Sequence, residues 1–201
     1  MPMSRHAIIA LSFALLAACG TSPPVRYYTL SEPPSATSSK TAGTIVALGP
    51  FTVPEYLEKP YIVIREKDQQ MRFAEYHRWA EIPQDALTAW LASDVDSQLS
   101  EATVVAFPSA NFSRADYRLR GAIAQWDVDV NGTAVLVVQW DCRASDDTPL
   151  LPVRTSRYTA QASNADDYPS IVQAMNETVA AFGRDITTAL AASLQEKPKD
   201  G

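Results

Sequence analysis

The sequence predicts an α+β domain, in which an antiparallel sheet carries two main helices packed on one face. Segments 82–100 and 168–190 repeat apolar residues at spacings of three and four, as amphipathic helices do. Short segments rich in β-branched and aromatic residues separate them and predict strands. An Asn-Gly pair at 131–132 lies between two of these segments, as in a β-hairpin.

Residues 1–18 have the layout of a secretory signal peptide. Arg5 supplies a positive charge, and Ser12 is the only polar residue of the run 7–18, AIIALSFALLAA. This run is too short for a bilayer, which takes about 17 to 25 apolar residues. A buried core helix is the alternative, but a run that is apolar on every face has nothing polar to present to water.

The segment Leu16-Ala17-Ala18-Cys19 resembles the lipobox of bacterial lipoproteins. In that class the cysteine thiol carries diacylglycerol, the signal is cut before the cysteine, and the new amine receives an acyl chain such as palmitate. We expect no cofactor beyond these chains on Cys19. One acyl chain binds a membrane only weakly, so several chains are needed to anchor the protein stably. Gly20 stands where an inner-membrane retention signal would place Asp, which implies the periplasmic face of the outer membrane. A coincidental cysteine after an ordinary signal is the alternative.

Residues 19–43 are expected to form a Ser- and Pro-rich tether, and residues 44–196 a single periplasmic domain. Within the tether, Tyr27–Leu30 reads as a short strand that docks onto the domain. The formal net charge is −6, without a basic cluster. This excludes nucleic acid as a partner and leaves membrane binding to the acyl chains.

The domain begins with a mixture of strands and one helix. Pro54 and Pro60 remove backbone donors, so residues 51–60 are expected to be irregular. In the helix, Ile82–Ser100, leucine or valine recurs every four residues and Pro83 lies in the first turn. The expected strands are Thr44–Leu48, which ends at Gly49-Pro50, then Tyr61–Arg65 and Met71–Tyr76 around a polar turn, and Thr103–Phe107.

Residues 127–132, DVDVNG, match the first half of a calcium-binding loop. The twelfth position of such a loop should be Glu and is Val138 here. A hairpin with Asn131-Gly132 as a two-residue type I′ turn is favoured, with Asp127 and Asp129 on its polar face. The expected pairs are Val130 with Thr133, Val128 with Val135, and Trp126 with Val137.

The last elements are a strand, Val153–Ala162, and a helix introduced by Asp166-Asp167 with Pro169 in its first turn. The helix could bind lipid or a partner through its apolar stripe, but we expect the stripe to face the sheet. The stripe consists of Tyr168, Val172, Met175, Val179, Phe182, Ile186 and Leu190.

Neither catalytic nor metal-binding motifs are present. The sequence lacks G-x-S-x-G, H-E-x-x-H and Walker patterns, and after removal of the signal only His77 is left for a zinc site. Cys142 could pair with His77 as a nucleophile, but a small apolar cysteine inside a strand is favoured. We therefore expect no enzyme.

Three segments together resemble the ABC-type transport auxiliary lipoproteins, which include the outer-membrane lipoprotein of the paraquat-inducible intermembrane transport system. The segments are Tyr27–Leu30, Pro54–Leu57 with Lys59–Val63, and Glu75–Glu81. The resemblance implies an accessory, docking subunit of an MCE-type intermembrane phospholipid transport system. Its implied partners are an MCE-domain periplasmic protein with its inner-membrane permease, outer-membrane lipid, and further copies of the chain in a homo-oligomeric ring.

Tyr56, Leu57, Tyr76 and Trp79 are the candidate partner contacts, because Tyr and Trp provide rigid contact area at interfaces. The alternative for Tyr76 and Trp79 is that they close the core beneath the first helix. Two rival functions stay open: a structural or assembly lipoprotein of the outer membrane without a part in lipid transport, and a hydrolase using Cys142.

Overall fold

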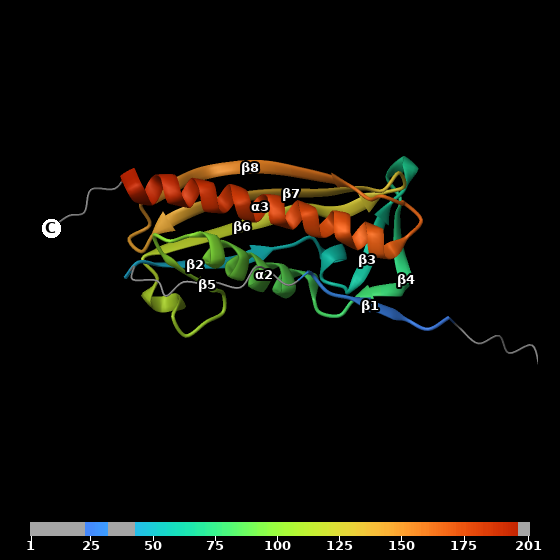
Figure 1. The fold of residues 1–201 in the computed structure, drawn as a ribbon, viewed down its shortest axis with the longest axis horizontal. Coiled ribbons are helices and arrows are strands. Elements are labelled where there is room, and N and C mark those ends of the chain that lie inside the picture. The colour runs from blue at the N-terminus through green and yellow to red at the C-terminus, as the bar shows by residue number, and fades with distance from the viewer. Residues whose placement is uncertain (1–22, 32–42, 197–201) are drawn as a thin grey trace, which may run out of the picture.

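The computed structural model describes residues 23–31 and 43–196. In these residues an eight-stranded sheet is packed against two long helices (Figure 1). The strands are β1 (Arg26–Tyr28), β2 (Ile45–Thr52), β3 (Tyr61–Arg65), β4 (Met71–Trp79), β5 (Thr103–Ala106), β6 (Tyr117–Asp129), β7 (Thr133–Ala144) and β8 (Pro149–Gln161). The helices are α2 (Pro83–Gln98) and α3 (Tyr168–Glu196), and the 3-10 turns are η1 (Glu55–Leu57), η2 (Lys67–Gln69) and η3 (Phe112–Arg114).

The sheet is mixed, and the prediction of an antiparallel sheet is wrong. Hairpins give the antiparallel pairs β3–β4, β6–β7 and β7–β8, whereas β1–β4, β2–β5, β2–β6 and β3–β6 are parallel. The long strand β6 pairs along one side with β2 and then β3, and along its other side with β7. Parallel strands are joined by long crossover connections. The prediction relied on short turns, which indicate only antiparallel pairs.

Strand β2 continues through Gly49-Pro50, where the sequence predicted its end. Gly49 has φ +102°, which is accessible to glycine and strained for other residues. The pairing with β6 shifts register between Leu48 and Phe51, so Pro50 lies at an irregularity of the ladder, where a missing donor is tolerated. The dipeptide therefore interrupts the regular pairing of the strand without terminating it.

The β6–β7 hairpin forms at the predicted place, but its register differs by one residue. The observed pairs are Val128 with Ala134 and Trp126 with Leu136, in place of Val135 and Val137. The loop holds three residues, and its last, Gly132, has φ +82°, as in a type I turn followed by a left-handed residue. The Asp129 carboxylate fixes this loop by accepting the backbone N–H groups of Asn131 and Thr133 at 2.8 and 2.9 Å.

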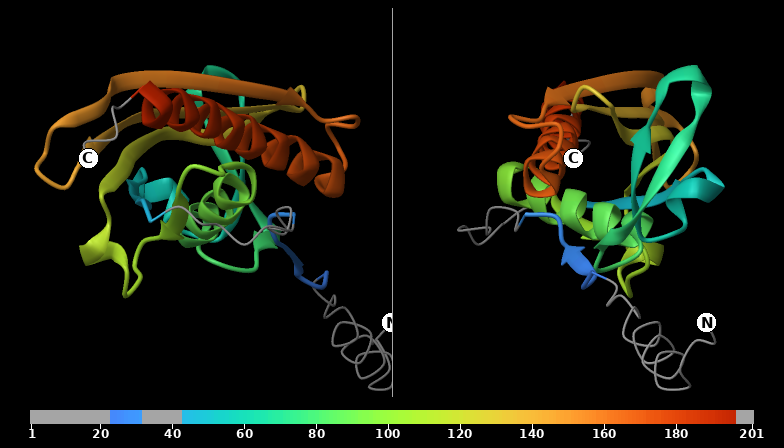
Figure 2. Two further views of the ribbon diagram at one scale, coloured as in Figure 1. Left: turned by 60° about the vertical axis from the view of Figure 1, so that its left-hand side comes forward. Right: turned by 90° about the vertical axis from the view of Figure 1, so that its right-hand side faces the viewer.

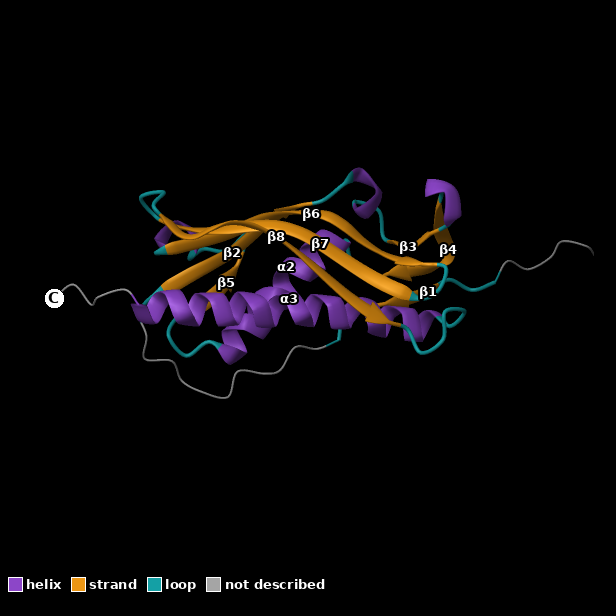
Figure 3. Cartoon of the chain, turned by 90° about the horizontal axis from the view of Figure 1, so that it is seen from above, coloured by secondary structure: helices purple, strands orange, loops and turns teal. Residues whose placement is uncertain are grey.

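Both predicted helices are present, and they pack against each other. α3 lies along β6, β7 and β8, while α2 contacts β2 and β5 (Figures 2 and 3). The stripe predicted on α3 faces the sheet, and its first member, Tyr168, is half-buried. The other members are buried: Val172, Met175, Val179, Phe182, Ile186 and Leu190. None of the helices in the described ranges is long and apolar enough to cross a membrane.

A buried carboxylate lies where the two helices meet. Asp94 of α2 is buried against Gly183 of α3, where any side chain would collide with Asp94 Oδ2. This oxygen has no hydrogen-bond donor among the described residues. Burial consequently raises the pKa of Asp94 above its ordinary value, although Gln98 and Arg184 oppose the rise.

We expect Asp94→Asn to stabilise the protein at pH 7. The native state binds the proton of Asp94 more tightly than the unfolded state does. The ionised carboxylate therefore lowers the free energy of unfolding by its full amount above the raised pKa, and this loss disappears as pH falls and Asp94 is protonated. Urea unfolding of both proteins between pH 4 and 7 should give a stability gain that shrinks toward low pH. The matched control is Glu177→Gln on the exposed side of α3, which should show no comparable gain. A gain that grows toward low pH would contradict a raised pKa of Asp94 in the native state.

Candidate functional site at the N-terminal strand

Strand β1 is the point where the chain arriving from Cys19 joins the domain. It lies parallel to β4, with Arg26 opposite His77 and Tyr28 opposite Trp79. The Tyr28 hydroxyl and His77 Nδ1 form a 2.8 Å hydrogen bond, and the His77 ring stacks on Tyr168 of α3 at a centroid distance of 3.6 Å. Desolvation lowers the pKa of His77, which favours its neutral form. The N-terminal segment is thus held by both the sheet and α3.

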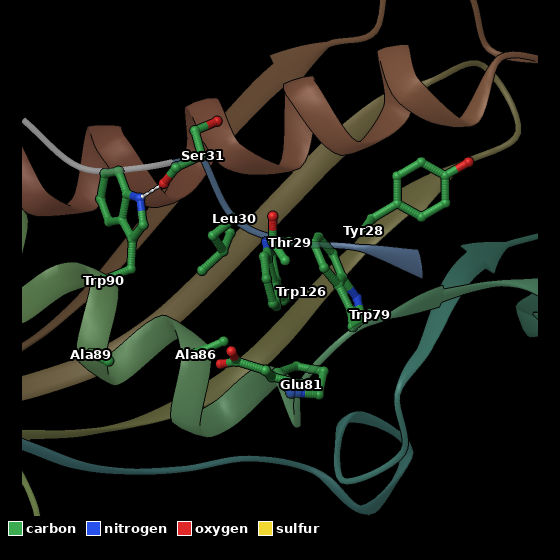
Figure 4. Close-up of a pocket in the computed structure, with 11 residues that line it drawn as sticks. Tyr28, Thr29, Leu30, Ser31, Trp79, Glu81, Ala86, Ala89, Trp90 and Trp126 are labelled. Atoms are coloured by element: carbon green, nitrogen blue, oxygen red, sulfur yellow. Dashed lines mark hydrogen bonds between the residues drawn. The ribbon is translucent and has the colours of Figure 1, made fainter. Parts of the chain in front are cut away.

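Immediately after β1 the chain passes over an apolar cavity of about 270 Å³. The stacked indoles of Trp79 and Trp126, 5.1 Å apart, form part of its wall together with the first turns of α2. Figure 4 shows the segment after Tyr28 running above α2, where the Trp90 indole N–H donates to the Ser31 carbonyl. The lining residues are Tyr28, Thr29, Leu30, Ser31, Trp79, Glu81, Pro83, Ala86, Ala89, Trp90 and Trp126.

A second cluster holds a buried charge on β6. Asp127 is 1% exposed, although the sequence placed it on a polar face. Arg65 donates to its two oxygens at 2.5 and 3.2 Å, and Gln125 donates at 2.7 Å. The Tyr56 hydroxyl donates at 3.2 Å, and burial together with the Asp127 charge raises the pKa of Tyr56 to about 12. These donors occupy the carboxylate, so the cluster fixes η1 and β3 to β6.

Cys142 is fully buried in β7. Burial, with the nearby Asp141 charge, raises the pKa of its thiol to about 12, so the nucleophilic thiolate is scarce at neutral pH.

We expect an aromatic disulfide reagent at pH 8 to leave Cys142 unmodified in the native protein and to modify it fully in urea. We also expect Cys142→Ser to keep function. Rapid modification of the native protein, or loss of function in the Ser variant, would favour the hydrolase alternative.

No curated protein matches the chain. The family described as ABC-type transport auxiliary lipoprotein component matches residues 28–187, from β1 into the last turns of α3. The chain belongs to this family. It is therefore an auxiliary lipoprotein component of an ABC-type transport system, lipid-anchored to a membrane and associated with ABC transport components. The family is one of transport auxiliary lipoproteins and not of enzymes.

Two solved structures share the fold of this auxiliary lipoprotein. The crystal structure of an uncharacterized protein is 20% identical with a TM-score of 0.68, and the match covers 84% of this chain and 99% of that one. A Xanthomonas campestris protein of the family DUF330 is 13% identical with a TM-score of 0.67, covering 85% and 98%. A PelC dodecamer from Paraburkholderia phytofirmans, at 15% identity, covers 77% and 93% but has a TM-score of only 0.37.

Two of the four candidate contact residues of the auxiliary lipoprotein are buried. Leu57 is 2% exposed and Trp79 is 4% exposed. Trp79 is therefore a core residue, which was the alternative to a partner contact. Tyr56 and Tyr76 are half-buried, and contact with a partner stays a prediction for them. The signal 1–18, Cys19 and most of the tether lie outside the described residues.

Sequence reasoning missed the Asp127 cluster and the cavity. The cluster joins residues of η1, β3 and β6, and the cavity joins residues of β1, β4, α2 and β6, so both form only after these elements assemble. The one usable signal was the density of tryptophan, since Trp79, Trp90 and Trp126 all line the cavity.

Proposed function

We propose that this auxiliary lipoprotein docks an MCE-domain periplasmic protein at the outer membrane, as the accessory subunit of an intermembrane phospholipid transport system. The family match over residues 28–187 carries the proposal. The lipobox at Cys19 and the Gly20 that follows it support an outer-membrane anchor, and the absence of catalytic motifs suits a docking part.

The short chain between Cys19 and β1 supports a position of the domain close to the bilayer surface. Arg26, the first residue of β1, lies only seven positions beyond Cys19. At about 3.3 Å per extended residue this stretch spans at most about 23 Å. Because β1 is tied to β4 and α3, the end of the domain that carries β1 stays near the membrane. A partner that reaches this membrane meets the surface around β1 and β4 first.

Two tyrosines supply aromatic surface for such a contact. Tyr76 lies on β4 beside β1, and Tyr27 of β1 is 64% exposed. Tyr76 is half-buried, so Tyr27 presents more of its ring to a partner. Aromatic side chains lose little conformational entropy on binding, which makes them effective at interfaces. We propose that several copies form a ring that presents these residues to a ring-shaped partner.

Photocrosslinking in intact cells tests the docking proposal. A photoreactive phenylalanine analogue replaces Tyr27 or Tyr76, and the same analogue replaces Phe112 in η3, toward the other end of the long axis in Figure 1, as the matched control. We expect Tyr27 and Tyr76 to capture an MCE-domain protein and Phe112 to capture it much less. Capture of cell-wall or outer-membrane assembly proteins alone would instead support the structural lipoprotein.

A further inference from the structure

We propose that the cavity lined by Tyr28–Ser31 and the two stacked indoles binds one acyl chain of a membrane phospholipid. This inference rests on the proposed lipid-transport function and gives the auxiliary lipoprotein a direct contact with the transported class of molecule. It concerns the cavity alone and does not depend on which protein the surface around β1 contacts.

The cavity wall has the chemistry of a hydrocarbon site. Indole rings, Leu30, Pro83 and two alanines make up most of it, and among the described residues that line it only Glu81 carries a charge. Apolar walls that enclose an apolar chain gain the free energy of removing both from water. The lining offers no cation to a phosphate group, so we expect the headgroup to remain outside, in water.

The size of the cavity favours one chain over a whole lipid. About 270 Å³ lies just below the range of about 300–1,000 Å³ that is typical of pockets holding a complete drug-sized ligand. An aromatic molecule as small as benzene enters an apolar cavity of about 150 Å³. The site therefore has room for a segment of one acyl chain.

The position of the cavity identifies the membrane as the source of the chain. Tyr28 and Leu30 lie nine and eleven residues beyond Cys19. The stretch from Cys19 to Tyr28 can extend at most about 30 Å at about 3.3 Å per residue. The anchor thus holds the cavity within one tether length of the bilayer surface, where the acyl chains of phospholipids are the most abundant apolar groups.

Three of the four tryptophans of the chain line the cavity, so the protein carries its own probe. The lipidated protein is reconstituted in phosphatidylcholine vesicles whose chains carry bromine at carbons 9 and 10, and in unbrominated vesicles as the reference. Bromine quenches tryptophan only at short range. We expect a loss of tryptophan emission in the brominated vesicles, and we expect Trp140→Phe, which changes the one tryptophan outside the cavity, to retain it.

Cavity-filling variants separate the cavity from the bilayer itself. Ala86→Phe and Ala89→Leu narrow the cavity from α2, and Ala89 is exposed enough for the change to be accommodated. Both should lose the quenching, while Ala124→Phe, at an exposed position of β6, should keep it. Flotation with the vesicles and an unchanged thermal transition verify that each variant is anchored and folded.

Two results would overturn the proposal. Wild-type emission that is equal in both kinds of vesicle would mean that no chain enters. Equal quenching of the wild type and the filled variants would mean that the tryptophans touch the bilayer, not a bound chain. Either result with intact photocrosslinks at Tyr27 and Tyr76 would leave the docking function standing, whereas quenching without those crosslinks would refute docking alone.

Discussion

Replacement of Asp127 by Ala should lower the free energy of unfolding by about 3 kcal/mol, since removing one partner of a buried ion pair typically costs about 3–5 kcal/mol. Asp127 is 1% exposed and accepts hydrogen bonds from Arg65, Gln125 and Tyr56, all of which would lose their acceptor. Arg65 retains some solvent access, which places the expected loss at the lower end. Urea unfolding followed by circular dichroism measures the effect.

The matched control removes an acid from an exposed ion pair. Glu66 pairs with Arg72 at 2.7 Å, with both side chains accessible to water. Exposed pairs typically contribute about 0.2–1 kcal/mol, so Glu66→Ala should change stability by less than about 1 kcal/mol. Equal losses in Asp127→Ala and Glu66→Ala would contradict the role assigned to the buried cluster.

Replacement of Phe182 by Ala should destabilise the protein by about 3–5 kcal/mol, as is typical of deleting a fully buried aromatic ring. Phe182 lies on α3 and contacts the rings of Phe51, Trp140 and Tyr158, which belong to three different strands. The variant would leave a cavity between α3 and the sheet that these rigid rings cannot fill. Urea unfolding at pH 7 measures the loss.

Two comparisons sharpen the Phe182 prediction. Phe182→Leu retains much of the buried volume and should cost clearly less than the alanine variant. Phe112→Ala removes a ring that is only half-buried in η3 and should cost less again. A loss in Phe182→Ala no larger than that in Phe112→Ala would show that α3 is not fastened to the sheet through this ring.

The elements of the fold follow from local pattern, but the order of the strands does not. Both helices lie where they were predicted. The apolar stripe of α3 and the proline at the start of α2 are local features, because each depends only on residues of the same helix. Parallel pairs such as β3–β6, with Ile64 opposite Val128, join segments that are far apart in the chain. Nothing in either segment alone encodes that pairing.

The same distinction between local and distant causes explains the errors at the site. Alternation along β6 predicts a polar face for Asp127, because consecutive residues of a strand point to opposite faces of the sheet and Trp126 points to the apolar face. The structure buries it because Tyr56 and Arg65 arrive from other elements to cover it. The hairpin register differs because the loop holds residues 130–132 in place of the expected two residues 131–132, so each residue of β6 pairs one position earlier on β7. The Asn-Gly pair does not distinguish the two loop lengths.

The proposed outer-membrane location, the short tether and the acyl-chain site all depend on membrane anchoring through Cys19. The most direct measurement compares the wild type with Cys19→Ala in cells, by metabolic labelling with a palmitate analogue and by flotation of separated inner and outer membranes. We expect the wild type to be labelled and to float with the outer membrane, and Cys19→Ala to be unlabelled and absent from that fraction. An unlabelled wild type, or a Cys19→Ala protein that still floats with the outer membrane, would contradict lipid anchoring through Cys19.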